Sequence, residues 1–357
     1  MGHQNRDPDG THRAQRHRGR KTDPRQQRAS APCDCGGRGQ RPMTILAIDG
    51  GASAAKWRLQ APDGSVLAQG TTSPLHGHIY APKDKQTARA LLTEIRAALP
   101  AGIVPDQIVG GIAGLAANSP ATRWYFREIR EVFAIDPAHI FVSDDLGMVF
   151  LGNFEPGQGM VLYAGTGAIA CHVTRDFQVK RAGGYGHLID DKGSGYWIGK
   201  TALKLFLRGL EESRDVSSSP LFSRLAAQFG GTDWDKLKPQ IYDGGRPLIA
   251  SLTLQVNAAA QDGDSTALSI LRQAGHALAD LANRLSERLR PPVRQVAFLG
   301  GVTRTARLVA DPLAARLNVG LTLAPSAIGD AQAMCRATEK YGADGLRQIL
   351  SGQTSQM

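Results

Sequence analysis

Apolar and polar positions follow the same order of periodicities twice along this chain. After residue 42, period-two alternation and short apolar runs predict strands, and apolar spacings of three and four residues predict helices. In the first half, strands are expected at Met43–Ile48, Ala55–Gln60, Ser65–Gly70, Gln107–Gly111 and His139–Ser143. Helices are expected at Thr87–Leu99 and Ala121–Phe133.

The second half repeats this order. Strands are expected at Gly159–Tyr163, Ala168–Thr174, Gln178–Ala182, Gln295–Leu299 and Gly320–Leu323. Helices are expected at Lys200–Glu212, Leu248–Ala260, Ser265–Arg290 and Ala327–Glu339. Alternating strands and helices in two similar halves predict a duplicated α/β protein whose two domains face each other across a cleft.

Composition narrows the class of protein. The 357 residues are 42% hydrophobic and 21% charged, which is typical of a globular protein long enough for two domains. No apolar run reaches the roughly 20 residues of a membrane helix. With 4 Cys there is no disulfide framework, so we expect a cytoplasmic protein without a membrane partner.

The net charge of +10 is concentrated in residues 1–42, which hold ten basic and four acidic residues and almost no aliphatic ones. Such a segment cannot bury enough apolar surface to offset the entropy of ordering, so it is expected to be a disordered basic leader. An RNA- or membrane-binding arm is the alternative interpretation. Because Met43 directly precedes the first strand, the leader is also consistent with upstream sequence read from an early start codon.

Three glycine turns follow predicted strands, and backbone N–H groups in such turns can bind phosphate. They comprise Asp49, Gly50, Gly51, Ala52 and Ser53; Gly165, Thr166 and Gly167; and Gly300 with Gly301. One turn alone is weak evidence, because Gly-Gly after a strand is common. The chain has no Gly-x-x-x-x-Gly-Lys-Ser/Thr motif, which excludes a P-loop.

These motifs carry a family resemblance from about Met43 to the last helix. Five sequence motifs stand in the order typical of one family: IDGGAS with KWRL, VSDD followed by LG, YAGTGA, AGGYGHLIDDKGSGYWIG and AFLGGV. The chain resembles the N-acetylglucosamine kinase branch of the BadF/BadG/BcrA/BcrD ATPase family, in the sugar-kinase and actin-like superfamily. The resemblance implies two ribonuclease-H-like domains with ATP in the interdomain cleft. Their expected extents are 43–155 plus a C-terminal helix at 328–357, and 156–327.

The resemblance also implies roles for the turn residues. Asp49–Ser53 and Gly165–Gly167 would bind the ATP phosphates, and Gly300 and Gly301 would lie beside the adenosine. Asp49 would hold Mg²⁺, in part through water. Asp145 matches the general base that accepts the proton of the sugar hydroxyl. From sequence alone, either Asp144 or Asp145 could instead be a helix N-cap.

The predicted sugar-binding residues are His78, Asp145, Gly184, Tyr185 and Asp191. Tyr185 stands where the family usually has Trp, and either ring can pack on a pyranose. Lys192 replaces the acidic residue of the family motif and changes the charge beside the sugar. If it lies near the C2 substituent, it disfavours a free amine and favours an N-acetyl group.

The expected activity is transfer of phosphate from ATP to the 6-hydroxyl of an amino sugar, with N-acetylglucosamine first and glucosamine or another hexose as alternatives. A different class, an ATP-driven activator, would need cysteines bridging an iron–sulfur cluster, whereas Cys171 and Cys335 are isolated. No nucleic-acid partner is expected, and the sequence leaves the oligomeric state open, with a homodimer as one option.

Overall fold

The computed structural model describes residues 43–51, 54–115, 119–212, 215–305 and 307–352. The first sheet has the strand order β3-β2-β1-β4-β5. Its strands are β1 (Ile45–Gly50), β2 (Ala55–Gln60), β3 (Val66–Thr72), β4 (Gln107–Ile112) and β5 (Ile140–Ser143). The first three pair antiparallel, while β1, β4 and β5 run parallel. The carboxyl ends of these three strands therefore meet at one edge.

The second sheet repeats this topology with the order β10-β9-β6-β7-β8. Its strands are β6 (Met160–Ala164), β7 (Ala168–Val173), β8 (Val179–Gly183), β9 (Gln295–Leu299) and β10 (Thr322–Leu323). Here β6 pairs antiparallel with β7 and parallel with β9, as β1 does with β2 and β4. The prediction of a duplicated α/β fold with two sheets is confirmed.

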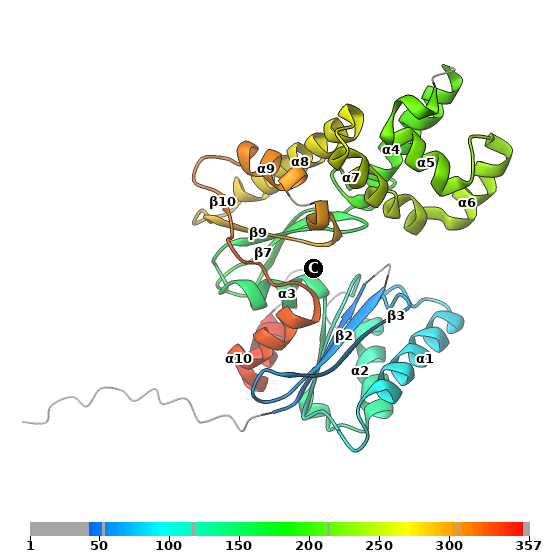
Figure 1. Ribbon diagram of the computed structural model, residues 1–357. Helices are drawn as coiled ribbons and strands as arrows, with labels where there is room; N and C mark the ends of the chain where they lie inside the picture. The colour runs from blue at the N-terminus through cyan, green and yellow to red at the C-terminus, as the bar shows by residue number, and fades with distance from the viewer. Residues whose placement is uncertain (1–42, 52–53, 116–118, 213–214, 306, 353–357) are drawn as a thin grey trace, which may run out of the picture. The chain divides into compact units, whose positions relative to one another are not determined.

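Helices cover the outer face of each sheet (Figure 1). On the first sheet, α1 (Pro82–Ala98) and α2 (Pro120–Phe133) share an apolar core with β1, β4 and β5. The second sheet packs against a larger helical layer. That layer comprises α4 (Gly195–Glu211), α5 (Pro220–Phe229), α6 (Trp234–Ser251), α7 (Thr253–Gln261), α8 (Ser265–Ser286) and α9 (Arg307–Arg316).

Two helices far apart in the sequence form a further core with the remaining faces of both sheets. α3 (Asp145–Asn153) follows β5, and α10 (Asp330–Gly352) is the last helix of the described chain. Met334 and Cys335 of α10 are fully buried with Ala47 of β1 and Val161 of β6. Gly152 of α3 allows α3 and α10 to lie in close contact, because a Cβ at this position would lie 2.4 Å from the Ala333 carbonyl oxygen of α10. The helix α3 is thus held by elements from both halves.

Several helix boundaries differ from the sequence predictions. α1 begins at Pro82, five residues before Thr87, because proline suits the first helical position and Asp84 accepts the Ala81 N–H (2.9 Å). α4 begins five residues before Lys200, where Ser194 caps it. The helices α5 and most of α6 were not predicted, and the predicted Leu248–Ala260 helix is the end of α6 followed by α7. Among the described residues, no helix is both long and apolar enough to cross a membrane.

Candidate active site

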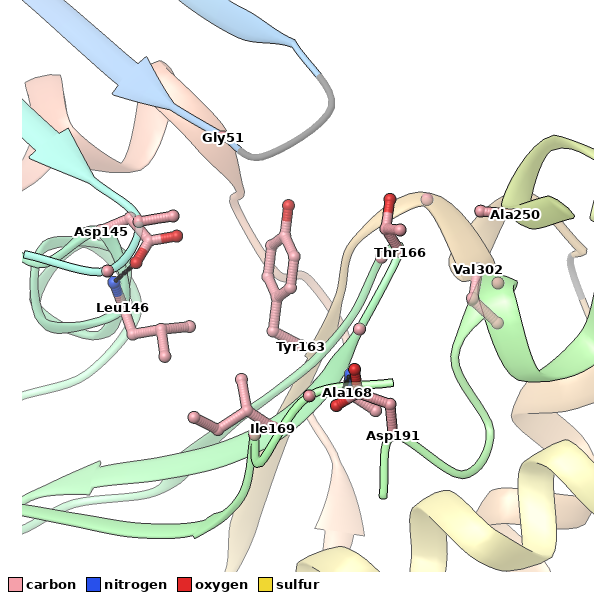
Figure 2. A pocket seen from close by; sticks show the side chains of 18 of the residues that line it. Gly51, Asp145, Leu146, Tyr163, Thr166, Ala168, Ile169, Asp191, Ala250 and Val302 are labelled. Carbon is pink, nitrogen blue, oxygen red and sulfur yellow. Dashed lines mark hydrogen bonds between the residues drawn. The ribbon is translucent and has the colours of Figure 1, made fainter. Parts of the chain in front are cut away.

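A cavity of about 1050 Å³ opens where the glycine turns and the carboxyl ends of the parallel strands converge. Its lining includes Asp49, Asp145 and Gly167, which lie far apart in the sequence. Figure 2 shows Tyr163 of β6 standing between Asp145 on one side and Thr166 on the other. The cavity has the size of a small-molecule site and joins acidic groups to phosphate-binding turns.

The two consecutive aspartates after β5 have different roles. Asp144 is the N-cap of α3, and its Oδ1 accepts the Leu146 N–H at 2.8 Å. Its Oδ2 accepts a hydrogen bond from Arg181 of β8 at 2.5 Å. Asp145 is the first residue of the helix and also accepts the Leu146 N–H, at 2.9 Å. The N-cap alternative therefore belongs to Asp144.

Asp145 is a carboxyl group whose proton affinity suits acid–base chemistry. Burial, followed by the negative charges of Asp144 and Asp49, raises the pKa of Asp145 well above its usual value. A general base works best when its pKa approaches the working pH. The position and environment of Asp145 therefore fit a group that accepts a proton from a substrate hydroxyl.

Asp49 lies at the end of β1, only 9% exposed, and lines the cavity. The strand β4 separates it from Asp145, because Asp49 pairs with Gly111 and Gly111 pairs with Ser143. Gly51 lines the cavity too, whereas a Cβ on Gly50 would lie 2.7 Å from the Leu75 carbonyl oxygen. Gly50 thus allows close packing. Ala52 and Ser53 of the predicted turn lie outside the described residues.

The second turn, Gly165–Gly167, joins β6 to β7 and lines the cavity throughout. Gly165 donates its N–H across the turn to the Gly167 carbonyl oxygen at 2.9 Å. The Gly165 carbonyl oxygen accepts the Gly195 N–H of α4 at 2.8 Å. The turn is therefore fixed to a helix N-terminus, whose partial positive charge favours an anion nearby.

The two glycines of the third turn have different surroundings. Gly300 has a φ of +97°, and a Cβ there would lie 2.4 Å from the Ala164 carbonyl oxygen, so it packs on the end of β6. Gly301 lines the cavity, and a Cβ on it would meet nothing within 4 Å. The missing side chain leaves room that a flat ligand such as a nucleoside could use, and the adenosine site stays a prediction.

The predicted sugar-binding residues are only partly brought together. His78 lines the cavity beside Gly114, and its Nδ1 lies 3.2 Å from the Tyr80 hydroxyl oxygen. Gly184 also lines the cavity. Tyr185 is 70% exposed and does not contribute to the lining, and Lys192 is exposed outside it as well. The charge argument that linked Lys192 to the sugar therefore has no support in this geometry.

Asp191 is 3% exposed and lies directly behind the second turn. Its Oδ1 accepts the Ala168 N–H at 3.2 Å, and its Oδ2 lies 3.4 Å from Nη2 of Arg246. A Cβ on Gly167 would come within 2.8 Å of the Asp191 carboxylate. Asp191 contacts the predicted phosphate-binding turn closely, and Figure 2 shows it below Ala168.

Sequence reasoning missed several charged residues of the cavity wall. These are Arg181, Arg246 and Arg304. Lys56 also lines the cavity and pairs across the strands with Asp49; the sequence favoured a solvated lysine there over a phosphate contact. Pro247, Ala250 and Leu254 form an apolar wall at the end of α6 and the start of α7. The strand register would have placed Lys56 beside Asp49. No periodicity marked Arg246, because the Gly-Gly-Arg-Pro sequence around it interrupts the helical pattern.

Metal binding can be judged from the donor atoms. No group of three or more His, Cys, Asp or Glu side chains suited to a metal occurs within the described ranges. Asp49 offers carboxylate oxygens, the donor type that Mg²⁺ prefers, in a cavity with room for water and phosphate ligands. The residues fit a Mg²⁺ ion bound through few protein ligands.

The chain has two mixed sheets of matching topology, and glycine turns and acidic strand ends surround a shared cavity. These features are typical of the actin-like ATPase class of α/β proteins. The model of the BadF/BadG/BcrA/BcrD ATPase family matches residues 46–314. The chain belongs to this family.

Several named proteins and solved structures are similar to this chain. An N-acetylmuramic acid/N-acetylglucosamine kinase of Clostridium acetobutylicum is 26% identical over 284 residues, covering 77% of this chain and 90% of that protein. The structure of a candidate N-acetylglucosamine kinase from Chromobacterium violaceum is similar with a TM-score of 0.60 and 25% identity, covering 83% of this chain and 99% of that one. A ROK family glucokinase from Streptomyces griseus, solved with glucose and AMPPNP, shares the fold with a TM-score of 0.53 and 16% identity; the match covers 83% of this chain and 98% of that one.

Proposed function

We propose that the protein is an ATP-dependent kinase that phosphorylates an amino sugar, N-acetylglucosamine, at its 6-hydroxyl. The observation that carries the proposal is the position of Asp145, a carboxyl with a raised pKa that shares one cavity with the turn Gly165–Gly167. The names of the Clostridium and Chromobacterium relatives support an amino sugar as the acceptor.

The chemistry is a direct phosphoryl transfer. Asp145 accepts the proton of the sugar hydroxyl, whose oxygen forms a bond to the γ-phosphorus of ATP. The bond from this phosphorus to the bridging oxygen breaks, and ADP leaves with the electron pair. Catalysis of this kind depends on positioning and on stabilising charge, with the proton acceptor contributing about 10²–10⁴-fold.

The other groups bind the nucleotide and its metal ion. We assign the polyphosphate to the turns at Gly51 and Gly165–Gly167, and the nucleoside to the space beside Gly301. Asp49 would hold Mg²⁺, which neutralises negative charge on the transferred phosphoryl group when it is bound. His78 and Gly184 line the remaining part of the cavity, where we place the sugar.

The alternative of an ATP-driven activator gains no support. Such a protein needs cysteines that can reach an iron–sulfur cluster at an interface. Cys171 and Cys335 are free and buried in the core that α3 and α10 share with the two sheets. The cytoplasmic location and the homodimer stay predictions.

The test is ADP release with N-acetylglucosamine, N-acetylmuramic acid, glucosamine and glucose as acceptors, compared by kcat/KM. We expect N-acetylglucosamine to give the largest value and 6-deoxy-N-acetylglucosamine to give no sugar-dependent release. ³¹P NMR of the product identifies the phosphorylated oxygen. ADP release that no sugar in the panel stimulates would exclude the proposed reaction.

A further inference from the structure

Arg246 stands at a break in α6. Gly245, with φ 50° and ψ −143°, interrupts the helix, and Pro247 follows. Glycine adopts such a conformation without the strain that a side chain brings. The interruption makes Arg246 the start of a new helical segment at the cavity wall.

The guanidinium of Arg246 has N–H donors without a good hydrogen-bond partner. Its Nε is buried and has no hydrogen-bond partner within the part of the chain that the structure describes. Its Nη2 lies 3.4 Å from Asp191 Oδ2, near the upper limit for a hydrogen bond. A buried donor without a partner costs free energy, and the single long contact of Nη2 leaves guanidinium donors that a ligand in the cavity can use.

The neighbouring chemistry favours an anion as that ligand. A Cβ on Gly167 would lie 3.1 Å from Arg246 Nη2, so the guanidinium directly adjoins the second glycine turn. A guanidinium presents a planar fork of N–H groups that matches two oxygens of a phosphate. Asp191 is buried, and its Oδ1 accepts the Ala168 N–H. Its Oδ2 lies beside Nη2 of Arg246, so Asp191 can hold the guanidinium in place without using Nε.

We propose that Arg246 is a nucleotide-binding residue whose terminal guanidinium N–H groups donate to a phosphate of the nucleotide at the turn Gly165–Gly167, and that Asp191 is the residue positioning it. This inference rests on the proposed function for the identity of the nucleotide. It gives Asp191 a contact on the nucleotide side of the cavity, and the contact of Asp191 with the sugar stays a prediction.

The test compares ligands that differ in their phosphates. Dissociation constants of ADP and adenosine are measured by calorimetry for the wild type and for Arg246→Gln. We expect ADP to bind about 10- to 100-fold more weakly in the variant, the loss typical of a charge-assisted bidentate contact, while adenosine changes less than about twofold. Arg272→Gln, on the exposed face of α8, removes the same charge away from the cavity and should change neither constant.

Two further variants separate a nucleotide contact from a structural one. Arg246→Lys keeps the charge but loses the fork, so its ADP affinity should be intermediate. Asp191→Asn should weaken ADP binding less than Arg246→Gln does, and the double variant should be no weaker than Arg246→Gln alone. Equal losses for ADP and adenosine in both Arg246 variants would indicate a structural role and overturn the inference.

The outcomes also separate this inference from the proposed function. Unchanged ADP binding in Arg246→Gln removes the inference and leaves sugar phosphorylation intact. A wild type that binds ADP but phosphorylates no sugar removes the proposed reaction, and the ratio of ADP to adenosine affinity still decides the role of Arg246. If Asp191→Asn raises the sugar KM and leaves ADP binding unchanged, Asp191 belongs to the sugar site and its positioning role is wrong.

Discussion

At the scale of single residues, the proposed role of Asp145 ties activity to the proton on its carboxyl group. The base must be ionised to accept a proton, and burial with two negative neighbours raises its pKa. Activity should therefore be present above this raised pKa and be lost as pH falls through it. Asp145→Asn keeps an acceptor for the Leu146 N–H but removes the proton acceptor, so kcat should fall by about 10²-fold or more.

ADP affinity provides the control for this variant. It should persist in Asp145→Asn, because the change lies outside the nucleotide contacts assigned above. Asp311→Asn on the exposed face of α9 gives the same charge change and should leave kcat unaltered. Turnover of Asp145→Asn within a few-fold of wild type would assign the base elsewhere.

Arg181 offers a second prediction, because it forms an ion pair with Asp144, the neighbour of the proposed base. Asp144 raises the pKa of Asp145 by repulsion, and Arg181 offsets that charge through its 2.5 Å contact with Asp144. Removing the cation in Arg181→Gln should raise the apparent pKa of Asp145 further, because the charge of Asp144 is then no longer offset. The acid limb of the kcat profile should then move to higher pH.

The measurement is kcat against pH at low and at high salt. Because Arg181 is 45% exposed, added salt should weaken the difference between variant and wild type. An acid limb that moves to lower pH, or stays in place, would show that the Arg181 charge does not act on the base.

At the scale of elements, one face of strand β4 packs against Asp145 at the start of α3 and against α10. A Cβ on Gly111 would lie 2.2 Å from Met334 Cε and 3.0 Å from Asp145 Cα. On neighbouring Gly110 the nearest atom would be 3.8 Å away. Gly111→Ala should displace the start of α3, lowering stability by about 1–3 kcal/mol and kcat by about 10-fold or more.

Gly110→Ala is the matched control in the same strand. Its new methyl group finds ordinary contacts, so kcat should remain within about threefold of wild type, far from the loss expected of a displaced base. Thermal unfolding and steady-state kinetics of both variants decide the matter. Equal effects of the two substitutions would mean that β4 does not position Asp145 through Gly111.

The elements also show what the sequence could reveal. Strands and most helices were predictable, because each has a regular apolar face, and the strand ends located Asp49 and Asp145. Most of the helix α6 was not predictable, because Gly244, Gly245 and Pro247 disrupt the apolar periodicity that indicates a helix. The position of Asp191 behind the second turn depends on a loop with φ +62° at that residue, and no local pattern specifies it.

At the scale of the whole molecule, the segment before Met43 should be dispensable for activity. The strand β1 begins at Ile45, and the family match begins at residue 46. A chain beginning at Met43 should therefore keep the Tm and turnover of the full chain, measured side by side. A fall in Tm of more than about 5 °C, or roughly 3 kcal/mol for a chain of this size, would contradict this prediction.

The position of α10 constrains the order in which the protein can fold during synthesis. Ile45 and Ala47 of β1 are buried against this helix, which is translated roughly 280 residues after β1. At a synthesis rate of about 5–20 residues per second, α10 is made about 15–55 s after β1. That face of the first sheet lacks the contact with α10 during this time. The nascent first half therefore exposes apolar strands to chaperones and to other nascent chains, and it should gain protease resistance only when α10 has left the ribosome.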